Sequence, residues 1–341
     1  MPEPANTNYV SFVARAKWYE SVDEPDSALF FYKSALALTS DNDSILKLNY
    51  NLADLNIRLE KTNAALDLLN VSDSLIARMS HVDDWFKLRK IHVTGKLYYL
   101  QRNYEAAQSL FEQVLDTVSA DSFENAVLVI RILNYKGIVS LAQSQVQLAL
   151  KNFQTADSLC KSWKVGGWDY ADVIQNIGII HAFQADYDSA GMYFEKSKNI
   201  REALYGVGDQ RLKSFYLNYA RYMYLLSNVE TSLKYNQMAE ALFLNQRNRN
   251  EETFGKLLLN IGNNFTVRND FEKAMIYYRN ALNAFSKVNA DRTTVNISKI
   301  NLAFVLNQLG KFEDAITLLN DIDKADLPNS TLAKIERNIA L

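Results

Sequence analysis

One spacing of small residues recurs along the whole chain and limits what it can fold into. In the clearest copy, residues 174–197, Gly178 is followed by Ala190 twelve positions later and by Phe194 sixteen positions later. The same template fits at eight anchors, which are Ala16, Ala53, Gly95, Gly137, Gly178, Ala220, Gly262 and Ala303. The steps between anchors are 37, 42, 42, 41, 42, 42 and 41 residues. A period sustained over 341 residues predicts one repeat array and not two ordinary domains.

The position twelve residues after each anchor is small in every copy. It is Ala in seven copies and Ser in the other: Ala28, Ala65, Ala107, Ala149, Ala190, Ser232, Ala274 and Ala315. Two small residues that face each other let two helices approach closely, while large residues around them fill the remaining space. Each repeat is therefore predicted to be a helical hairpin. The predicted fold is all-α, with about eight hairpins in a single array over residues 9–341.

The end of the chain repeats the sequence found around the anchors. The last five residues, RNIAL, match QNIGI at Gly178 and INLAF at Ala303, so Ala340 would be a ninth anchor. Solenoids more often end in a polar capping helix. We therefore expect a terminal helix that stops in mid-repeat, in an array truncated at its C-terminal end.

Charge and composition argue against several classes of function. The net charge is −2, from 37 basic and 39 acidic residues, so no global field would attract nucleic acid. Apolar runs such as residues 126–130 are far shorter than the roughly 20 residues of a membrane-spanning helix, so no membrane contact is expected. Neither feature determines the oligomeric state.

The compartment stays open. The single cysteine, Cys160, excludes an internal disulfide framework and fits both a reducing cytosol and a cysteine-poor exported domain. The first residues lack a basic and then apolar signal segment, which slightly favours the cytoplasm. A periplasmic or otherwise exported chain whose signal peptide has been removed would read the same way.

Around Gly178 the template has Ile174, Ile177 and His181 on the first helix and Ala190, Phe194 and Ser197 on the second. This pattern resembles the tetratricopeptide repeat (TPR), which has large, small and aromatic residues on its first helix and Ala, aromatic and Ala on its second. The period exceeds the usual 34 residues and resembles the 42-residue subclass of kinesin light chains and many bacterial arrays. The segment FEKSKNIREALYGVGDQ, residues 194–210, is similar to that subclass's helix end and loop. Lys136 and Asn236 depart from the pattern. The resemblance implies a right-handed superhelix whose first helices line a concave groove.

Asparagine recurs two positions before the anchors. These residues are Asn51, Asn176, Asn218, Asn260, Asn301 and Asn338. At 100° per residue this position lies away from the packed side of the helix, facing the groove or a neighbouring first helix. Amides suit the backbone of an extended peptide. Alternatively, each Asn bonds to the adjacent repeat and keeps register, the more usual arrangement for buried polar groups.

Basic residues are frequent on the same side of the first helices. Two positions of each repeat are meant, the one six residues before the anchor and the one directly after it. They hold seven basic residues, Lys17, Lys47, Arg89, Lys96, Arg131, Arg221 and Lys256, and two acidic ones, Asp54 and Asp172. A basic groove would favour an acidic segment of a partner. Ordinary charge scatter on a solvated helix face is an equal alternative. Tyr50, Tyr99, Tyr224 and Phe304 add aromatic surface nearby, although aromatic residues at helical spacing more often belong to the core.

A search for catalytic or metal-binding motifs finds little. His81, His92 and His181 have no second His or Cys at metal-ligand spacing. His181 occupies a packing position and is expected to be a core histidine bonded to a neighbour. A nucleophilic Cys160 would need a converging His and orienting groups. We therefore expect no enzyme, no cofactor and no metal site.

The sequence thus predicts a non-catalytic protein–protein interaction scaffold that binds a peptide segment or partner domain in its groove. The candidate binding residues are Asn176, Asn218, Asn260, Asn301, Arg89, Lys96, Arg131, Arg221, Lys256 and Tyr224. The alternative, implied by similar bacterial arrays, is a sensory or regulatory N-terminal array of a larger protein. Its effector domain, beyond Leu341, would be a CHAT-type protease, a histidine kinase or a transcriptional regulator.

Overall fold

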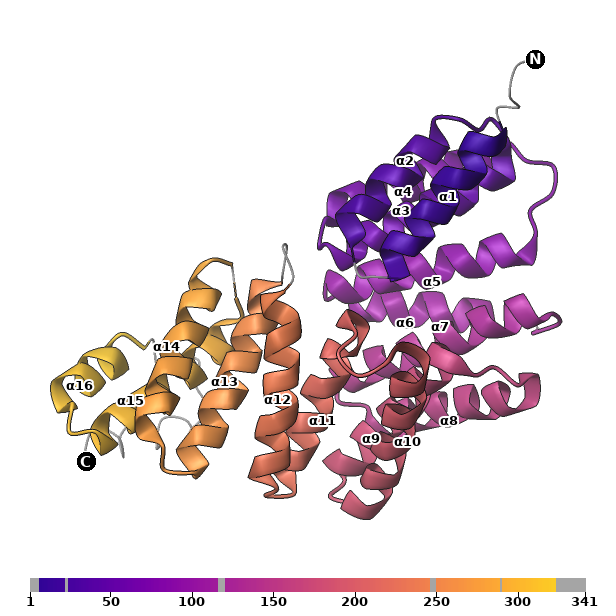
Figure 1. Cartoon of the computed structure of the whole chain (residues 1–341). Helices are drawn as coiled ribbons and strands as arrows, with labels where there is room; N and C mark the ends of the chain where they lie inside the picture. Colours follow the sequence, from indigo (N-terminus) through magenta and orange to yellow (C-terminus); the bar gives the residue numbers. More distant parts are fainter. Residues whose placement is uncertain (1–5, 22–23, 116–119, 246–249, 289, 323–341) are drawn as a thin grey trace. The chain divides into compact units, whose positions relative to one another are not determined.

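The chain is built of helices that alternate in direction (Figure 1). The computed structural model describes residues 6–21, 24–115, 120–245, 250–288 and 290–322. Within these ranges it contains sixteen α-helices, one 3-10 turn and no strand. The predicted all-α solenoid of eight helical hairpins is therefore confirmed. The expected terminal helix around Ala340 lies outside the described residues.

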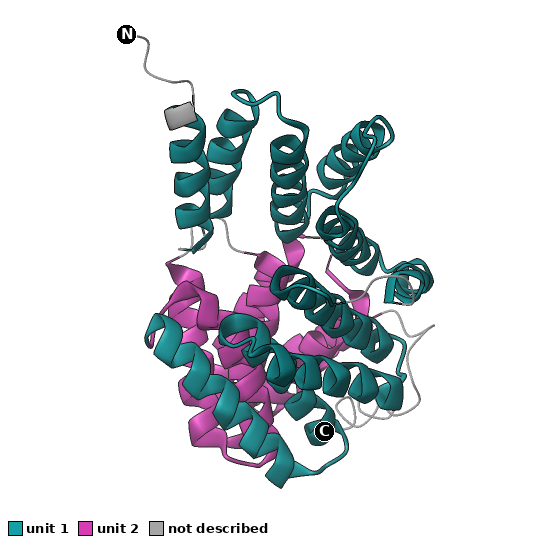
Figure 2. Ribbon diagram, turned by 90° about the vertical axis from the view of Figure 1, so that its right-hand side faces the viewer, with its two compact units in different colours: residues 1–206 teal, residues 207–341 magenta. Residues whose placement is uncertain are grey.

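The chain forms two compact units, residues 1–206 and 207–341 (Figure 2). The prediction of a single array over residues 9–341 stays a prediction.

The first unit holds five hairpins, α1 (Asn6–Ser21) with α2 (Pro25–Leu36), α3 (Asn42–Arg58) with α4 (Thr62–Ile76), α5 (Asp84–Leu100) with α6 (Tyr104–Leu115), α7 (Phe123–Ala142) with α8 (Val146–Trp163), and α9 (Gly167–Phe183) with α10 (Tyr187–Tyr205). The second unit holds the 3-10 turn η1 (Gln210–Leu212) and three hairpins, α11 (Lys213–Leu225) with α12 (Val229–Leu244), α13 (Glu251–Val267) with α14 (Phe271–Ser286), and α15 (Arg292–Gln308) with α16 (Phe312–Asn320).

The same turn closes seven of the hairpins. Seven positions after the anchor, the backbone takes a left-handed conformation with φ between 57° and 71°, at Glu60, Arg102, Ser144, Ala185, Ser227, Asn269 and Gly310. The next residue then donates its N–H to a carbonyl five residues back, as Lys61 does to Asn56 at 2.8 Å. This is the Schellman ending of an α-helix. The turn is local, so these seven hairpins close at the same distance from their anchors.

The anchors are buried against the second helix of their own hairpin. A Cβ atom placed on Gly95 would lie 2.1 Å from Cζ of Phe111, and one on Gly137 would lie 2.4 Å from Cε1 of Phe153. Gly therefore accompanies an aromatic residue sixteen positions later. Three of the four Ala anchors have a smaller residue there, namely Leu69, Asn236 and Leu319, and the exception is Ala16 with Tyr32.

The two departures from the repeat pattern have different settings. Asn236 follows an Ala anchor, Ala220, and is buried where other repeats place a ring. Lys136 lies beside the anchor of α7 and places Nζ 3.5 Å from Oε1 of Glu112 on α6. The first departure leaves Oδ1 of Asn236 buried without a hydrogen-bond partner among the described residues, whereas an ion pair accommodates the second.

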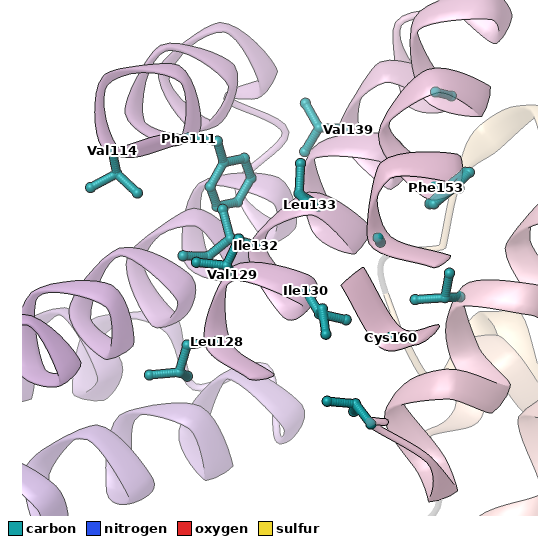
Figure 3. Packing of buried hydrophobic residues seen from close by; sticks show 14 of the residues in the cluster. Phe111, Val114, Leu128, Val129, Ile130, Ile132, Leu133, Val139, Phe153 and Cys160 are labelled. Atoms are coloured by element: carbon teal, nitrogen blue, oxygen red, sulfur yellow. The ribbon is translucent and has the colours of Figure 1, made fainter. Parts of the chain in front are cut away.

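Helix α7 runs through the centre of the largest core cluster of the first unit. Phe111 of α6 lies beside Ile132 and Leu133 of α7 (Figure 3). Among the described residues, α7 alone is long and apolar enough to cross a membrane, but 61% of that apolar stretch is buried inside the protein. Burial to this extent is typical of a helix at the centre of a protein core.

Candidate functional site

The first helices of the first unit line a groove with a volume of about 410 Å³, here called the α1–α9 groove. Its charged lining residues are Lys17, Glu20, Asp54, Arg89, Lys96, Arg131, Asp169 and Asp172. They come from α1, α3, α5, α7 and α9. Several occupy the positions six before and one after an anchor, so the structure places that side of these helices at a groove.

Asp54 of α3 is the centre of an ionic cluster at one end of this groove. It pairs with Lys96 of α5, and its Oδ2 lies 3.5 Å from Nη2 of Arg89. Burial acts to raise the pKa of Asp54, but the charges of Lys96 and Arg89 outweigh it and hold that pKa well below its usual range. The three side chains bind α3 to α5 and are charged at neutral pH.

Two further pairs connect the other helices of the groove. Arg131 of α7 grips Asp169 of α9 in a bidentate pair, with Nε to Oδ1 at 2.7 Å and Nη2 to Oδ2 at 3.0 Å. Behind α9, Arg201 of α10 is 1% exposed and donates to Asp172 at 2.6 Å. Its guanidinium also stacks over the ring of Trp168 at 4.2 Å. Such bidentate and stacked arginines hold fixed geometry.

The basic excess predicted for this side of the helices is not found in the groove. Its lining holds four basic and four acidic side chains. The sequence count took only two positions per repeat, and it missed Asp169, nine residues before its anchor, and Glu20, four residues after its anchor. Arg201 was also missed, since its role depends on contacts within one hairpin and no repeated spacing marks it.

Three members of the asparagine row bond to a neighbouring first helix. Asn176 donates Nδ2 to Oδ1 of Asn134 at 2.8 Å, between α9 and α7. Asn301 donates to Asn263 at 3.0 Å, between α15 and α13. Asn51 accepts from Nη2 of Arg89 at 3.3 Å. These bonds favour the interpretation in which the row keeps neighbouring repeats in register. Asn338 lies outside the described residues.

The candidate binding residues are divided between the two units. Arg89, Lys96 and Arg131 meet in the α1–α9 groove, and Asn176 is bonded to its lining. The others, Asn218, Asn260, Asn301, Arg221, Lys256 and Tyr224, belong to the second unit. Arg221 and Tyr224 are exposed on α11, and Lys256 pairs with Glu252 one turn earlier at 2.5 Å. Of the aromatic candidates, Tyr50 is a core residue and adds no surface.

The histidines differ from one another. His92, to which the sequence assigned no role, is buried beside the groove, where its Nδ1 accepts from Nη1 of Arg89 at 3.2 Å. Burial, and then the charges of Lys96 and Arg89, hold the pKa of His92 well below its usual value. His181 is bonded to Asp186 at 2.9 Å, as expected of a packing histidine, but it is partly exposed and does not lie in the core.

Nothing in the described part of the chain resembles a catalytic or metal centre. Burial raises the pKa of Cys160 to about 12, so the thiol is protonated and a poor nucleophile. No group of three or more His, Cys, Asp or Glu side chains there could hold a metal ion. Fold and groove together define an all-α repeat protein built from helical hairpins.

Comparisons with known proteins agree with this class. Residues 245–334 match the family model described as the SusR N-terminal TPR domain. Comparison with the curated proteins finds no match. The chain thus contains tetratricopeptide repeats over residues 245–334, and membership of the 42-residue subclass stays a prediction.

Three solved structures show the shared fold at 13–15% identity. The APC/C hetero-tetramer Cut9–Hcn1 has a TM-score of 0.65 at 13% identity, over 95% of this chain and 58% of that one. A Rap protein complexed with Competence and Sporulation Factor has a TM-score of 0.63 at 14% identity, over 99% of this chain and 95% of that one. A STAND signal transduction ATPase with a TPR sensor from Pyrococcus horikoshii has a TM-score of 0.62 at 15% identity, over 97% of this chain and 46% of that one. The chain thus spans little more than half of the first of these chains and less than half of the third.

Proposed function

We propose that the chain is a non-catalytic protein–protein interaction scaffold whose α1–α9 groove binds a peptide segment of a partner. The observation that carries this proposal is the groove itself, which five successive first helices line with charged groups and amides. Structures with this fold include a Rap protein in complex with Competence and Sporulation Factor and Cut9 in complex with Hcn1.

The groove offers both donors and acceptors on rigid supports. The partly buried pairs of Asp54 with Lys96 and of Arg131 with Asp169 position their side chains before a ligand arrives, which lowers the entropy lost on binding. With equal numbers of positive and negative groups, the groove suits a segment that carries charges of both signs better than a strongly acidic one. Arg89, Lys96 and Arg131 would contact the ligand, with Asn176 supporting the wall.

A binding experiment with matched variants tests the proposal. A peptide ligand would first be selected from a random peptide library on the full chain, and its Kd measured by calorimetry. Lys17→Gln and Arg131→Gln alter the groove, and Lys33→Gln removes an exposed charge on the outer helix α2. We expect each groove variant to weaken binding about tenfold or more, as for loss of one charge-assisted contact, with no change for Lys33→Gln.

The swapped pair Arg131→Asp with Asp169→Arg gives a second control. It retains an ion pair between α7 and α9 and reverses only its direction. Restored thermal stability without restored binding would place Arg131 in contact with the ligand. Full affinity in Lys17→Gln, Arg131→Gln and the swapped pair would refute a site in this groove.

A second candidate function is that of a regulatory array in a longer protein. The observation in its favour is the match of residues 245–334 to a TPR domain described as N-terminal in SusR. In this version the groove senses a ligand and an effector domain follows Leu341. The coding sequence after Leu341 tests it directly: an open frame with an effector domain is expected, and an immediate stop codon would refute it.

A further inference from the structure

The second unit contains a pocket that lies outside the predicted binding residues. It is formed by α12, the end of α13 and α14, and its volume is about 480 Å³, within the range of ligand-binding pockets. We call it the α12–α14 pocket. Two of the three helices are the second helices of their hairpins, whereas the α1–α9 groove is lined by first helices.

The floor of the pocket is apolar. Leu233 of α12 and Phe265 of α13 line it and are each 6% exposed. Tyr277 of α14 stacks on Phe265, with ring centroids 5.5 Å apart and an angle of 21° between the planes. Leu233 and Phe265 are buried and Tyr277 is half-buried, and together they give a packed surface on which one apolar side chain can lie.

Positive charge surrounds this floor. Lys234, Arg268 and Lys273 line the pocket together with a single acid, Glu230, so the lining carries an excess of two positive charges. Arg268 pairs with Glu230 at 3.5 Å and Lys273 pairs with Asp270 at 2.8 Å, and both cations are exposed. Nζ of Lys273 also lies 5.3 Å from the centroid of the Phe265 ring. Lys234 has no acidic partner among the residues that the structure describes.

Exposed ion pairs of this kind contribute little to stability. A ligand carboxylate can therefore take the place of Glu230 or Asp270 with a small loss of folding free energy. The cations of the α1–α9 groove differ in this respect. Arg131 is held in a bidentate pair, and Arg201 behind it is fully buried. Three cations that an acidic ligand can reach therefore lie together at the α12–α14 pocket.

We propose that the α12–α14 pocket binds an acidic peptide segment that places one apolar side chain on the floor of Leu233, Phe265 and Tyr277. The flanking carboxylates pair with Lys234, Arg268 and Lys273 in place of Glu230 and Asp270. The bases of single-stranded nucleic acid also stack on aromatic side chains, so the floor alone does not separate the two ligands. The charge does, because the chain's net charge of −2 supplies no wider field for a polyanion.

Short synthetic peptides test the inference on the full chain. The probe is Ac-Glu-Asp-Leu-Asp-Glu-NH2, with Ac-Gln-Asn-Leu-Asn-Gln-NH2 as the uncharged control and Ac-Glu-Asp-Ala-Asp-Glu-NH2 as the control for the apolar contact. Binding is followed by calorimetry and by NMR shifts of the amides of α12–α14. We expect the probe to bind at least tenfold tighter than either control and to weaken as salt is raised.

Matched variants locate the site. Arg268→Gln and Lys273→Gln should each weaken the probe severalfold without lowering Tm, because both side chains are exposed. Lys287→Gln removes a third exposed cation of the same unit, near the end of α14 and outside the pocket, and should change nothing. Lys17→Gln should also have no effect, which separates this site from the α1–α9 groove.

Four results would overturn the inference. The first is equal binding of the charged and uncharged peptides. The second is unchanged affinity in both Arg268→Gln and Lys273→Gln. The third is no detectable binding of the probe at millimolar concentration. The fourth is a single-stranded oligonucleotide that binds tighter than the probe and loses affinity in the same variants, which would make the pocket a nucleic-acid site.

Discussion

Replacing the anchor Gly95 by Ala should destabilise the first unit through a clash with Phe111. The added methyl group would lie 2.1 Å from Cζ and 2.2 Å from Cε1 of that ring, so the ring would have to retreat by about 1.3 Å to reach an ordinary contact of 3.4 Å. Phe111 is fully buried and packs in a core cluster with residues of α7, and protein cores are close-packed. Overpacking of this kind costs about 1–3 kcal/mol.

The repeats themselves suggest a compensating change. Where the anchor is Ala53, the residue sixteen positions later is Leu69 and not an aromatic residue. Phe111→Leu alone leaves a void and should also destabilise, by about 1–3 kcal/mol. In Gly95→Ala/Phe111→Leu the methyl group occupies part of that void, so the two losses should not add, and the coupling should be roughly 1–2 kcal/mol in favour of the double variant.

Urea unfolding followed by circular dichroism gives the four free energies of this cycle. Gly178→Ala is the matched control, because its nearest atoms would be 3.1 Å and 3.4 Å from the new Cβ, and it should lose less than half as much stability as Gly95→Ala. Additive losses in the double variant would refute the volume argument. An equal loss in Gly178→Ala would show that the glycine backbone, and not the ring, sets the requirement.

Three further predictions follow from single positions. The pKa of His92 is lowered in the folded protein, so the stability it contributes is present above its unfolded pKa near 6.5. That stability is lost as pH falls below this value, by about 1.4 kcal/mol per pH unit. Urea titrations between pH 7 and 5 should show a smaller slope of the unfolding free energy against pH in His92→Gln, and an unchanged slope would contradict the assignment. Ala185→Gly should raise Tm by relieving up to about 1 kcal/mol of left-handed strain at φ 58°, whereas Gly310→Ala, at the equivalent turn position with φ 71°, should lower it. Cys160 should resist alkylation by iodoacetamide at pH 8 until the protein is unfolded in urea, because its buried thiol has a pKa of about 12, and rapid modification of the native protein would show that the thiol is accessible.

The sequence alone determined the repeat, the hairpins and the class of fold. These properties depend on interactions within about twenty residues, namely the contact of small anchors such as Gly178 with Ala190 and a turn that closes seven residues after the anchor. Local geometry of this kind repeats with the sequence, so its period is readable without a structure. The sequence also placed Arg89, Lys96 and Arg131 on the side of the first helices that lines the α1–α9 groove.

Only the tertiary structure decided how the charges on that side are used. Asp54 meets Lys96 across 42 residues and Arg131 meets Asp169 across 38, and each pairing depends on how far one first helix is displaced along its neighbour. A shift of a single helical turn would exchange the partners. The period of the repeat does not specify this displacement, because it is set by the packing of the large side chains between hairpins. The count of two positions per repeat predicted a basic stripe, whereas the folded groove also brings in Glu20 and Asp169 and so holds four basic and four acidic side chains.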